Sequence, residues 1–207
     1  MAATLRRAVF LDRDGVVIED RGPLTEARDI TVLGGVPEAL ARLKAAGFCL
    51  VFISNQTAVA RGLLTSAGVR ELQAVIERKL GGGTQLVDGF YFCPHHPKAT
   101  LPAFRCACAC RKPAPGLLRE ASNALGIDLG ASIMIGDRPS DVVAGKRAGC
   151  RTIQVLTGRH GEPHIEVEGG FEATTPDFVC DSLLDAASWI LHATGSTKDH
   201  SPMEVVA

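Results

Sequence analysis

The chain has 207 residues, of which 46% are hydrophobic and 22% are charged, and its formal net charge is -1. This composition is typical of a globular protein with a sizeable core, and the near-neutral charge argues against a nucleic-acid partner. The apolar run after Arg7 is too short for a signal-peptide core, and no stretch is long enough to cross a bilayer. We therefore expect a cytoplasmic protein with no membrane partner.

Short apolar runs alternate with segments of helical periodicity along most of the chain. The expected strands are residues 8–11, 49–53, 89–92, 132–135 and 152–156, with 177–179 as a candidate for a further short strand. The expected helices are residues 37–46, a segment that Thr65 or Ser66 can cap and that runs to about residue 80, and residues 115–125, 139–148 and 181–192. Such alternation predicts βαβ units, and hence an α/β fold with a three-layer, Rossmann-like parallel sheet.

We expect a single domain over residues 1–193, with a long loop over 158–175. The tail 194–207 has no periodicity and is expected to be disordered.

Reactive side chains follow three of the buried strands. Asp12 and Asp14 end the first, Ser54 follows the second, and Asp137 follows the fourth. Lys112 comes just before the helix that starts near residue 115. Because the carboxyl ends of parallel strands meet at one edge of a sheet, these side chains can converge there.

Together these residue types suit phosphoryl transfer. One carboxylate can act as nucleophile and a neighbouring carboxyl as acid and base. Mg²⁺ held by Asp12, Asp14 and Asp137 would screen the attack of one anion on another. Ser54 and Lys112 would hold the phosphoryl oxygens. Taken singly, each residue also has an ordinary structural explanation as a cap, turn or surface residue; their joint occurrence at strand ends favours catalysis.

One segment is crowded with metal-ligand side chains. It holds Cys93, His95, His96, Cys106, Cys108 and Cys110. Four such ligands make a closed tetrahedral Zn²⁺ site, which would be structural because it leaves no position for a substrate. Free thiols are the alternative, although thiols rarely cluster this closely without a metal.

The order of these motifs resembles the haloacid dehalogenase superfamily of phosphatases. The matching elements are Asp12-Arg13-Asp14-Gly15, Ser54, Lys112 and Gly136-Asp137 with Asp141. The resemblance implies that Asp12 is the nucleophile and Asp14 the general acid and base. It also implies that the backbone carbonyl of Asp14 touches Mg²⁺, and that Asp141 orients Lys112 or a metal-bound water.

The cysteine segment narrows this resemblance. C-P-H-H-P at 93–97 and F-R-x-x-C-x-C-R-K-P at 104–113 are similar to the D-glycero-D-manno-heptose 1,7-bisphosphate phosphatases, and histidinol-phosphate phosphatases share the branch. The family implies a compact enzyme without a separate cap domain. It also implies a zinc-stapled loop over 93–110, whose Zn²⁺ ligands are Cys93, His95, Cys108 and Cys110; Cys106 and His96 then lie outside the shell.

The same resemblance, which spans about residues 8–158, implies the substrate contacts. They fall at Asp20, Arg21, Gly22, Pro23, Ser54, Asn55, Gln56, Thr57, Arg111, Lys112 and Arg138. Pro23 stands where the family often has an aromatic residue, and Arg138 where it often has lysine. Arg111 and Arg138 suit a substrate with a second phosphate, which needs a cation away from the reaction centre.

These inferences predict a monomeric, Mg²⁺-dependent, Zn²⁺-stabilised phosphatase acting on a small phosphorylated sugar. The expected reaction removes the 7-phosphate of a heptose 1,7-bisphosphate through an aspartyl phosphate. The alternative substrate is histidinol phosphate or another small phosphomonoester. A non-catalytic, zinc-stabilised module that only binds phosphorylated metabolites is the rival of another class, but a binder needs no Asp12 nucleophile.

Overall fold

A computed structural model describes residues 5–81, 85–159 and 174–195 of the chain. Its strands are β1 (Ala8–Leu11), β2 (Cys49–Asn55), β3 (Gly89–Cys93), β4 (Ile133–Gly136), β5 (Arg151–Val155) and β6 (Phe178–Cys180). They form one sheet in the order β3-β2-β1-β4-β5-β6, and every pair of neighbours is parallel. The predicted α/β fold with a parallel sheet is confirmed.

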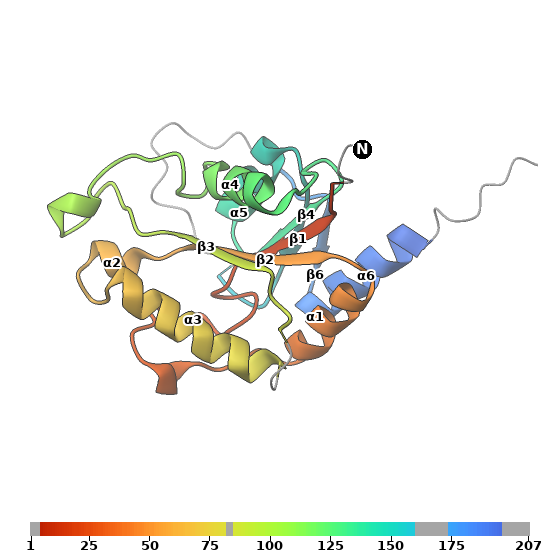
Figure 1. The fold of residues 1–207 in the computed structure, drawn as a ribbon, viewed down its shortest axis with the longest axis horizontal. Helices are drawn as coiled ribbons and strands as arrows, with labels where there is room; N and C mark the ends of the chain where they lie inside the picture. Colours follow the sequence, from red (N-terminus) through yellow and green to blue (C-terminus); the bar gives the residue numbers. More distant parts are fainter. Residues whose placement is uncertain (1–4, 82–84, 160–173, 196–207) are drawn as a thin grey trace, which may run out of the picture.

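Helices cover both faces of this sheet. They are α1 (Val36–Ala45), α2 (Thr57–Ala60), α3 (Ser66–Gly81), α4 (Gly116–Leu125), α5 (Pro139–Ala148) and α6 (Leu183–Gly195), with 3-10 turns at Ala27–Asp29 and Pro102–Phe104. Figure 1 shows α4 and α5 on one side of the sheet and α1, α3 and α6 on the other, which gives three layers.

Side chains of the central strand feed both layers. Val9 and Leu11 belong to the core beneath α1, α3 and α6, whereas Ala8 and Phe10 belong to the core beneath α4. All four are fully buried. Burial on both faces explains why the sequence of this strand is a continuous apolar run rather than an alternating one.

Two expectations need correction. The single turn of α2 was not predicted, because four residues are too few to produce a periodic apolar pattern. Helix α6 continues through Gly195, so the expected disordered tail cannot begin at residue 194. Helix ends fray, so the last residue of a helix is fixed only to within one or two positions. Residues 196–207, and residues 160–173 of the expected long loop, lie outside the described part of the chain. Within that part, no helix has the length and apolar character to traverse a bilayer.

Strand register brings the candidate side chains to one edge. Leu11 is paired with Phe52 on one side and with Ile135 on the other, so β4 ends one residue beyond the end of β1 and β2 runs three residues beyond it. Asp12, the β2 residue Ser54 and Asp137 follow from these ends. The β5 strand also ends there and leads into residues 157–159.

Candidate active site

Asp12 and Lys112 form a buried ion pair at the centre of this edge. Lys112 Nζ lies 2.9 Å from Asp12 Oδ1, and the two residues are 3% and 7% exposed. The backbone N–H of Arg13 donates to the same oxygen at 2.7 Å. Burial is the main reason that the pKa of Asp12 rises to about 8; nearby Asp141 and Asp137 add to the rise, and Lys112 opposes it. The positive charge near the Asp12 carboxylate is therefore too small to offset the effect of its burial.

Lys112 is held from several directions. Its Nζ also lies 2.7 Å from Asp141 Oδ1 and donates to the Ile53 carbonyl at 2.9 Å. The Asn55 side chain makes two hydrogen bonds with the Lys112 backbone. It accepts from the N–H at 3.1 Å and donates to the carbonyl at 3.0 Å. Burial disfavours the ammonium, but Asp12 and Asp141 outweigh burial and raise the pKa of Lys112. The lysine thus stays charged.

Asp137 is fully buried beside this pair. Its Oδ2 accepts the backbone N–H of Arg159 at 2.7 Å, while its Oδ1 is buried without a hydrogen-bond partner. Burial and the charge of Asp141 raise its pKa to about 6. Gly15 and Gly158 pack so closely on the carboxylate that a Cβ on either would lie 2.5 or 2.2 Å from Oδ2. Only glycine fits at these two positions.

Carboxylate oxygens of Asp12, Asp137 and Asp141 lie within 4.8 Å of one another and could hold a cation. The carboxylate of Asp14 is not in this group. It is paired with the buried Arg13, whose Nη2 lies 2.9 Å from Asp14 Oδ1. The three carboxylates expected to bind magnesium therefore do not all lie together. The side chain of Asp14 is paired with Arg13, whereas that of Asp12 faces Asp137.

Gln56 links Asp14 to the end of β2. Its side-chain amide donates to Asp14 Oδ2 at 2.9 Å and to Ser54 Oγ at 2.8 Å, and its carbonyl oxygen accepts from Arg13 at 3.0 Å. Ser54 Oγ lies 3.5 Å from Asp14 Oδ2. The side chains of Asn55 and Gln56, expected to contact substrate, are thus engaged within the protein. Thr57 begins α2 and is half-buried.

A second charged group lies at the ends of β4 and β5. Asp20 Oδ2 accepts from Arg138 Nη2 at 2.9 Å and faces Arg159 Nε at 3.0 Å, while Asp20 Oδ1 accepts the Gly22 N–H at 2.9 Å. Arg21 is exposed and paired with Glu19. Pro23 is exposed on the same loop. Arg159, three residues after the end of the predicted strand 152–156, was not among the predicted site residues.

The four expected zinc ligands form a compact cluster at the end of β3. Cys110 Sγ lies 3.2 Å from Cys93 Sγ and from Cys108 Sγ, and His95 Nδ1 lies 3.4 Å from Cys110 Sγ. A zinc ion with ligands at about 2.3 Å would have tetrahedral edges of about 3.8 Å, close to these spacings. The set fits a closed zinc site.

Two neighbouring ligand-type residues stay outside this cluster. Cys106 is exposed, and His96 Nδ1 accepts the backbone N–H of Lys98 at 3.0 Å. Arg111 joins the cluster to the reaction centre, since its Nη1 donates to the His95 carbonyl at 3.1 Å and Lys112 follows it. The loop therefore positions the backbone on which Lys112 is carried.

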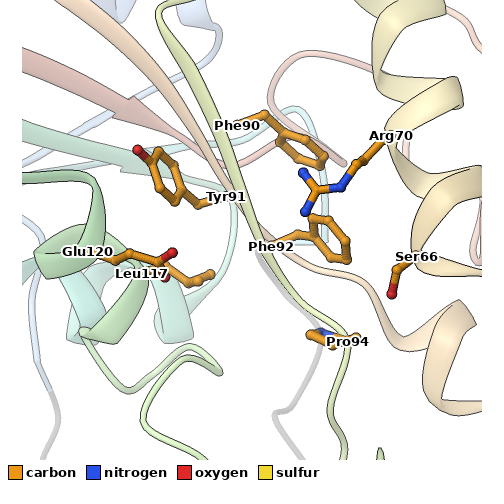
Figure 2. A pocket seen from close by; sticks show the side chains of 8 residues that line it. All are labelled: Ser66, Arg70, Phe90, Tyr91, Phe92, Pro94, Leu117 and Glu120. Atoms are coloured by element: carbon orange, nitrogen blue, oxygen red, sulfur yellow. The ribbon is translucent and has the colours of Figure 1, made fainter. Parts of the chain in front are cut away.

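A cavity of about 370 Å³ lies on the open edge of β3. Figure 2 shows Phe90, Phe92 and Arg70 on one side of the strand and Tyr91, Leu117 and Glu120 on the other. No residue of the predicted site lines this cavity. It is separate from the group around Asp12.

Known proteins resemble this chain over most of its length. The HAD-hydrolase-like family model matches residues 109–186. The D-glycero-beta-D-manno-heptose-1,7-bisphosphate 7-phosphatase of Yersinia pestis is 41% identical over 178 residues, covering 86% of this chain and 92% of the relative. The enzyme of the same name from Escherichia coli K12 is 38% identical, covering 86% and 90%.

Solved structures of similar proteins share the fold of this chain. The D,D-heptose 1,7-bisphosphate phosphatase of B. bronchiseptica, complexed with magnesium and phosphate, has a TM-score of 0.75 at 32% identity, covering 90% of this chain and 99% of its own. The corresponding phosphatase from Burkholderia thailandensis has a TM-score of 0.60 at 24% identity, covering 90% and 99%, and shares the fold.

Proposed function

We infer the function from the family to which the chain belongs, the heptose 1,7-bisphosphate phosphatases among the HAD-like hydrolases. The protein is a phosphatase. We propose that it removes the 7-phosphate from D-glycero-β-D-manno-heptose 1,7-bisphosphate, the substrate named for its relatives. The observation that carries the proposal is the buried pair of Asp12 and Lys112, 2.9 Å apart, with Asp137 beside it.

In the first step an oxygen of Asp12 bonds to phosphorus as the bond from phosphorus to the sugar oxygen breaks. Asp14 gives its proton to the leaving oxygen, for which its carboxyl turns from Arg13 toward the substrate. Lys112 Nζ and Ser54 Oγ stabilise the charge that builds on the phosphoryl oxygens. The product is an aspartyl phosphate on Asp12 and the heptose 1-phosphate.

In the second step Asp14 takes a proton from water, and the water oxygen attacks phosphorus. The bond between Asp12 and phosphorus breaks, which releases inorganic phosphate and restores both carboxyl groups. Asp141 serves this cycle indirectly: it holds Lys112 Nζ at 2.7 Å and keeps the ammonium beside Asp12.

The donor set fits Mg²⁺. The unpartnered Oδ1 of Asp137 and the raised pKa values of Asp12 and Asp137 mark a place where a cation would stabilise both carboxylates. We propose that Asp12, Asp137 and the Asp14 carbonyl hold the ion. When bound, it offsets the negative charges of nucleophile and phosphate.

We propose a structural Zn²⁺ on Cys93, His95, Cys108 and Cys110, supported by the spacing of their ligand atoms. A cluster of reduced thiols suits a reducing compartment, which supports a cytoplasmic location. The single domain over residues 1–193 and the monomeric state stay predictions.

The test is phosphate release from both anomers of the heptose bisphosphate, with histidinol phosphate beside them. The proposal expects kcat/KM for the β-anomer to exceed that for histidinol phosphate at least about 100-fold, since two phosphates contribute binding. Equal rates on the two anomers would remove the anomer assignment. A preference for histidinol phosphate would overturn the proposed substrate.

A further inference from the structure

Arg13 is a charged residue that the fold buries between the two candidate catalytic carboxyls. Its side chain is only 1% exposed, and its Nη2 lies 2.9 Å from Asp14 Oδ1 and 3.0 Å from Asp14 Oδ2. Its Nε donates to Asp14 Oδ2 at 3.2 Å. Arg13 therefore contacts both oxygens of the carboxyl that is proposed above to transfer the proton.

Gln56 connects Arg13 to Asp14 from the end of β2. Its Oε1 accepts from Arg13 Nη2 at 3.0 Å, and its Nε2 donates to Asp14 Oδ2 at 2.9 Å. Only one orientation of the amide satisfies both contacts, because a guanidinium group can only donate and an ionised carboxylate can only accept. Gln56 is 4% exposed, and its own N–H donates to the Cys93 carbonyl at 2.8 Å. Arg13, Gln56 and Asp14 thus form one closed set of hydrogen bonds.

The backbone of Arg13 is fixed at the same place. Its N–H donates to Asp12 Oδ1 at 2.7 Å, and its carbonyl accepts the N–H groups of Val17 at 2.9 Å and of Ile18 at 3.1 Å. Val17 and Ile18 belong to the hydrophobic core. Arg13 therefore holds the proposed nucleophile through its backbone and Asp14 through its side chain.

Stability alone does not account for an arginine at this position. Its Nη1 is buried without a hydrogen-bond partner among the described residues. A buried donor without a partner costs free energy, and apolar side chains of similar volume can often replace a buried ion pair without loss of stability. What an apolar residue could not replace is the set of hydrogen bonds to the Asp14 carboxyl.

We propose that Arg13, together with Gln56, is a positioning residue for Asp14. The two side chains confine the Asp14 carboxyl to a short path between its present place and the leaving oxygen, and they return it before water attacks the aspartyl phosphate. Neither needs to touch the reacting phosphorus. This inference rests on the proposed function, in which Asp14 transfers a proton in both steps, and deepens it by naming the groups that control where Asp14 lies.

Other roles for the same two residues would have different kinetic effects. A contact between Gln56 and substrate, which the family resemblance implies, would act mainly on KM. An effect of the Arg13 charge on Asp12 or on the proposed Mg²⁺ would change the Mg²⁺ concentration needed for activity and would not depend on Asp14. A positioning role lowers kcat only when Asp14 is present to be positioned.

The experiment is a double-mutant cycle between Arg13→Met and Asp14→Asn, measured as phosphate release from the heptose 1,7-bisphosphate. Methionine fills much of the same buried space without a charge or a donor. Arg13→Lys restores the charge as a compact ammonium, which lacks the planar fork that spans two carboxylate oxygens. Arg7→Met is the matched control, because Arg7 is exposed, lies just before the opposite end of the same strand and places its guanidinium over the Phe48 ring.

Arg13→Met is expected to lower kcat roughly 10- to 100-fold, the loss typical of a misplaced catalytic group, with KM nearly unchanged. Arg13→Lys should recover part of the loss, and Arg7→Met should have no effect. In the Asp14→Asn background Arg13→Met should change kcat less than about twofold, because the group that it positions no longer transfers a proton. An equal loss in both backgrounds, or a higher Mg²⁺ requirement in Arg13→Met, would overturn the proposal.

Gln56→Glu tests the same role without removing the buried arginine. It keeps the acceptor for Arg13 but replaces the donor to Asp14 with a negative charge, so Arg13 should pair with the added carboxylate and release Asp14. We expect kcat to fall by a similar factor, again only when Asp14 is present. A rise in KM with unchanged kcat would instead assign Gln56 to substrate binding and overturn its positioning role.

Failure of the proposed function has its own signature in this experiment. Asp14→Asn with the kcat of wild type would show that Asp14 does not transfer the proton, whatever Arg13 does. A wild-type enzyme that releases no phosphate from the heptose bisphosphate would refute the proposed substrate, and the cycle would then be measured on histidinol phosphate. A large loss in Asp14→Asn with none in Arg13→Met or Gln56→Glu would refute the positioning role alone.

Discussion

Two clusters of potential metal ligands flank the carboxyl edge of the sheet, and they are built differently. The acidic centre draws Asp12, Lys112, Asp137 and Asp141 from three distant segments and buries all of them. The sulfur cluster takes its four residues from the end of β3 and the loop that follows it, and three of the four are only half-buried. Strand ends, ion pairs and close-packed glycines hold the acidic centre in place. The sulfur cluster is held mainly by contacts among its own ligand atoms.

This difference indicates that the acidic centre serves the reaction and that the sulfur cluster serves the local structure. The acidic centre keeps its shape because the sheet is rigid and Lys112 neutralises part of its charge. The loop has little core of its own, so the zinc proposed above would supply the order that packing does not. Losing the proposed nucleophile from the first should abolish activity with little effect on the fold, whereas losing a ligand from the second should lower stability and reduce activity less severely.

The largest expected effect is that of Asp12→Asn on activity. The amide keeps the size of the carboxylate but cannot form the aspartyl phosphate, so phosphate release should fall roughly 10⁴- to 10⁶-fold. Zinc content and the far-UV circular dichroism spectrum should be unchanged. Residual release within tenfold of wild type would place the nucleophile elsewhere.

Removing a sulfur ligand should affect zinc content and stability more than activity. Cys108→Ser is expected to abolish stoichiometric zinc, measured by elemental analysis, and to lower the melting temperature, while activity falls only about 10- to 100-fold. The smaller loss follows because Asn55 still holds the Lys112 backbone by two hydrogen bonds. Cys106→Ser is the control and should keep one zinc per chain; zinc retained in Cys108→Ser would show that Cys108 is not a required ligand.

A third comparison lies within the acidic centre. Asp141→Asn removes the charge that faces Lys112 but keeps an oxygen to accept the Arg138 N–H, so kcat should fall about tenfold with stability nearly unchanged. Asp141→Ala also removes the cap of α5 and should lose roughly 1 kcal/mol more in free energy of unfolding. Urea titrations separate the two. Equal stability of both variants would contradict the capping role.

The smallest effect is a pH dependence of stability. Burial is the main reason that the pKa values of Asp12 and Asp137 rise to about 8 and about 6 from the usual 3.8, so in the metal-free protein both carboxyls bind protons more tightly when folded. Their contribution to stability is full below about pH 4 and is lost as the pH rises to about 8. The melting temperature of the metal-free protein should therefore fall across this window, and Asp12→Asn should reduce the fall. Added Mg²⁺ should restore stability at pH 8; an Asp12→Asn variant with the wild-type slope would refute the assignment.

Much of the site was predictable because its residues occupy the ends of strands. Asp12, Ser54 and Asp137 follow runs whose apolar character predicts burial, and a parallel sheet must bring such ends together. Contact of Asn55 and Gln56 with substrate stays a prediction, but the sequence did not predict that their side chains hold Asp14, Ser54 and the Lys112 backbone. Hydrogen-bond partners depend on distances across the fold, and a motif does not encode them.

The sequence alone predicted the alternation of strands and helices and the parallel sheet, because apolar periodicity is a local property, whereas the choice of four zinc ligands among the clustered cysteines and histidines came from the family resemblance. Tertiary structure alone decided that Asp14 turns to Arg13, that Asp141 shares Lys112 with Asp12, and that Asp20 sits between Arg138 and Arg159. Each of these pairings joins side chains of opposite charge. Which side chains pair depends on which of them the packed loops bring within about 3 Å of one another.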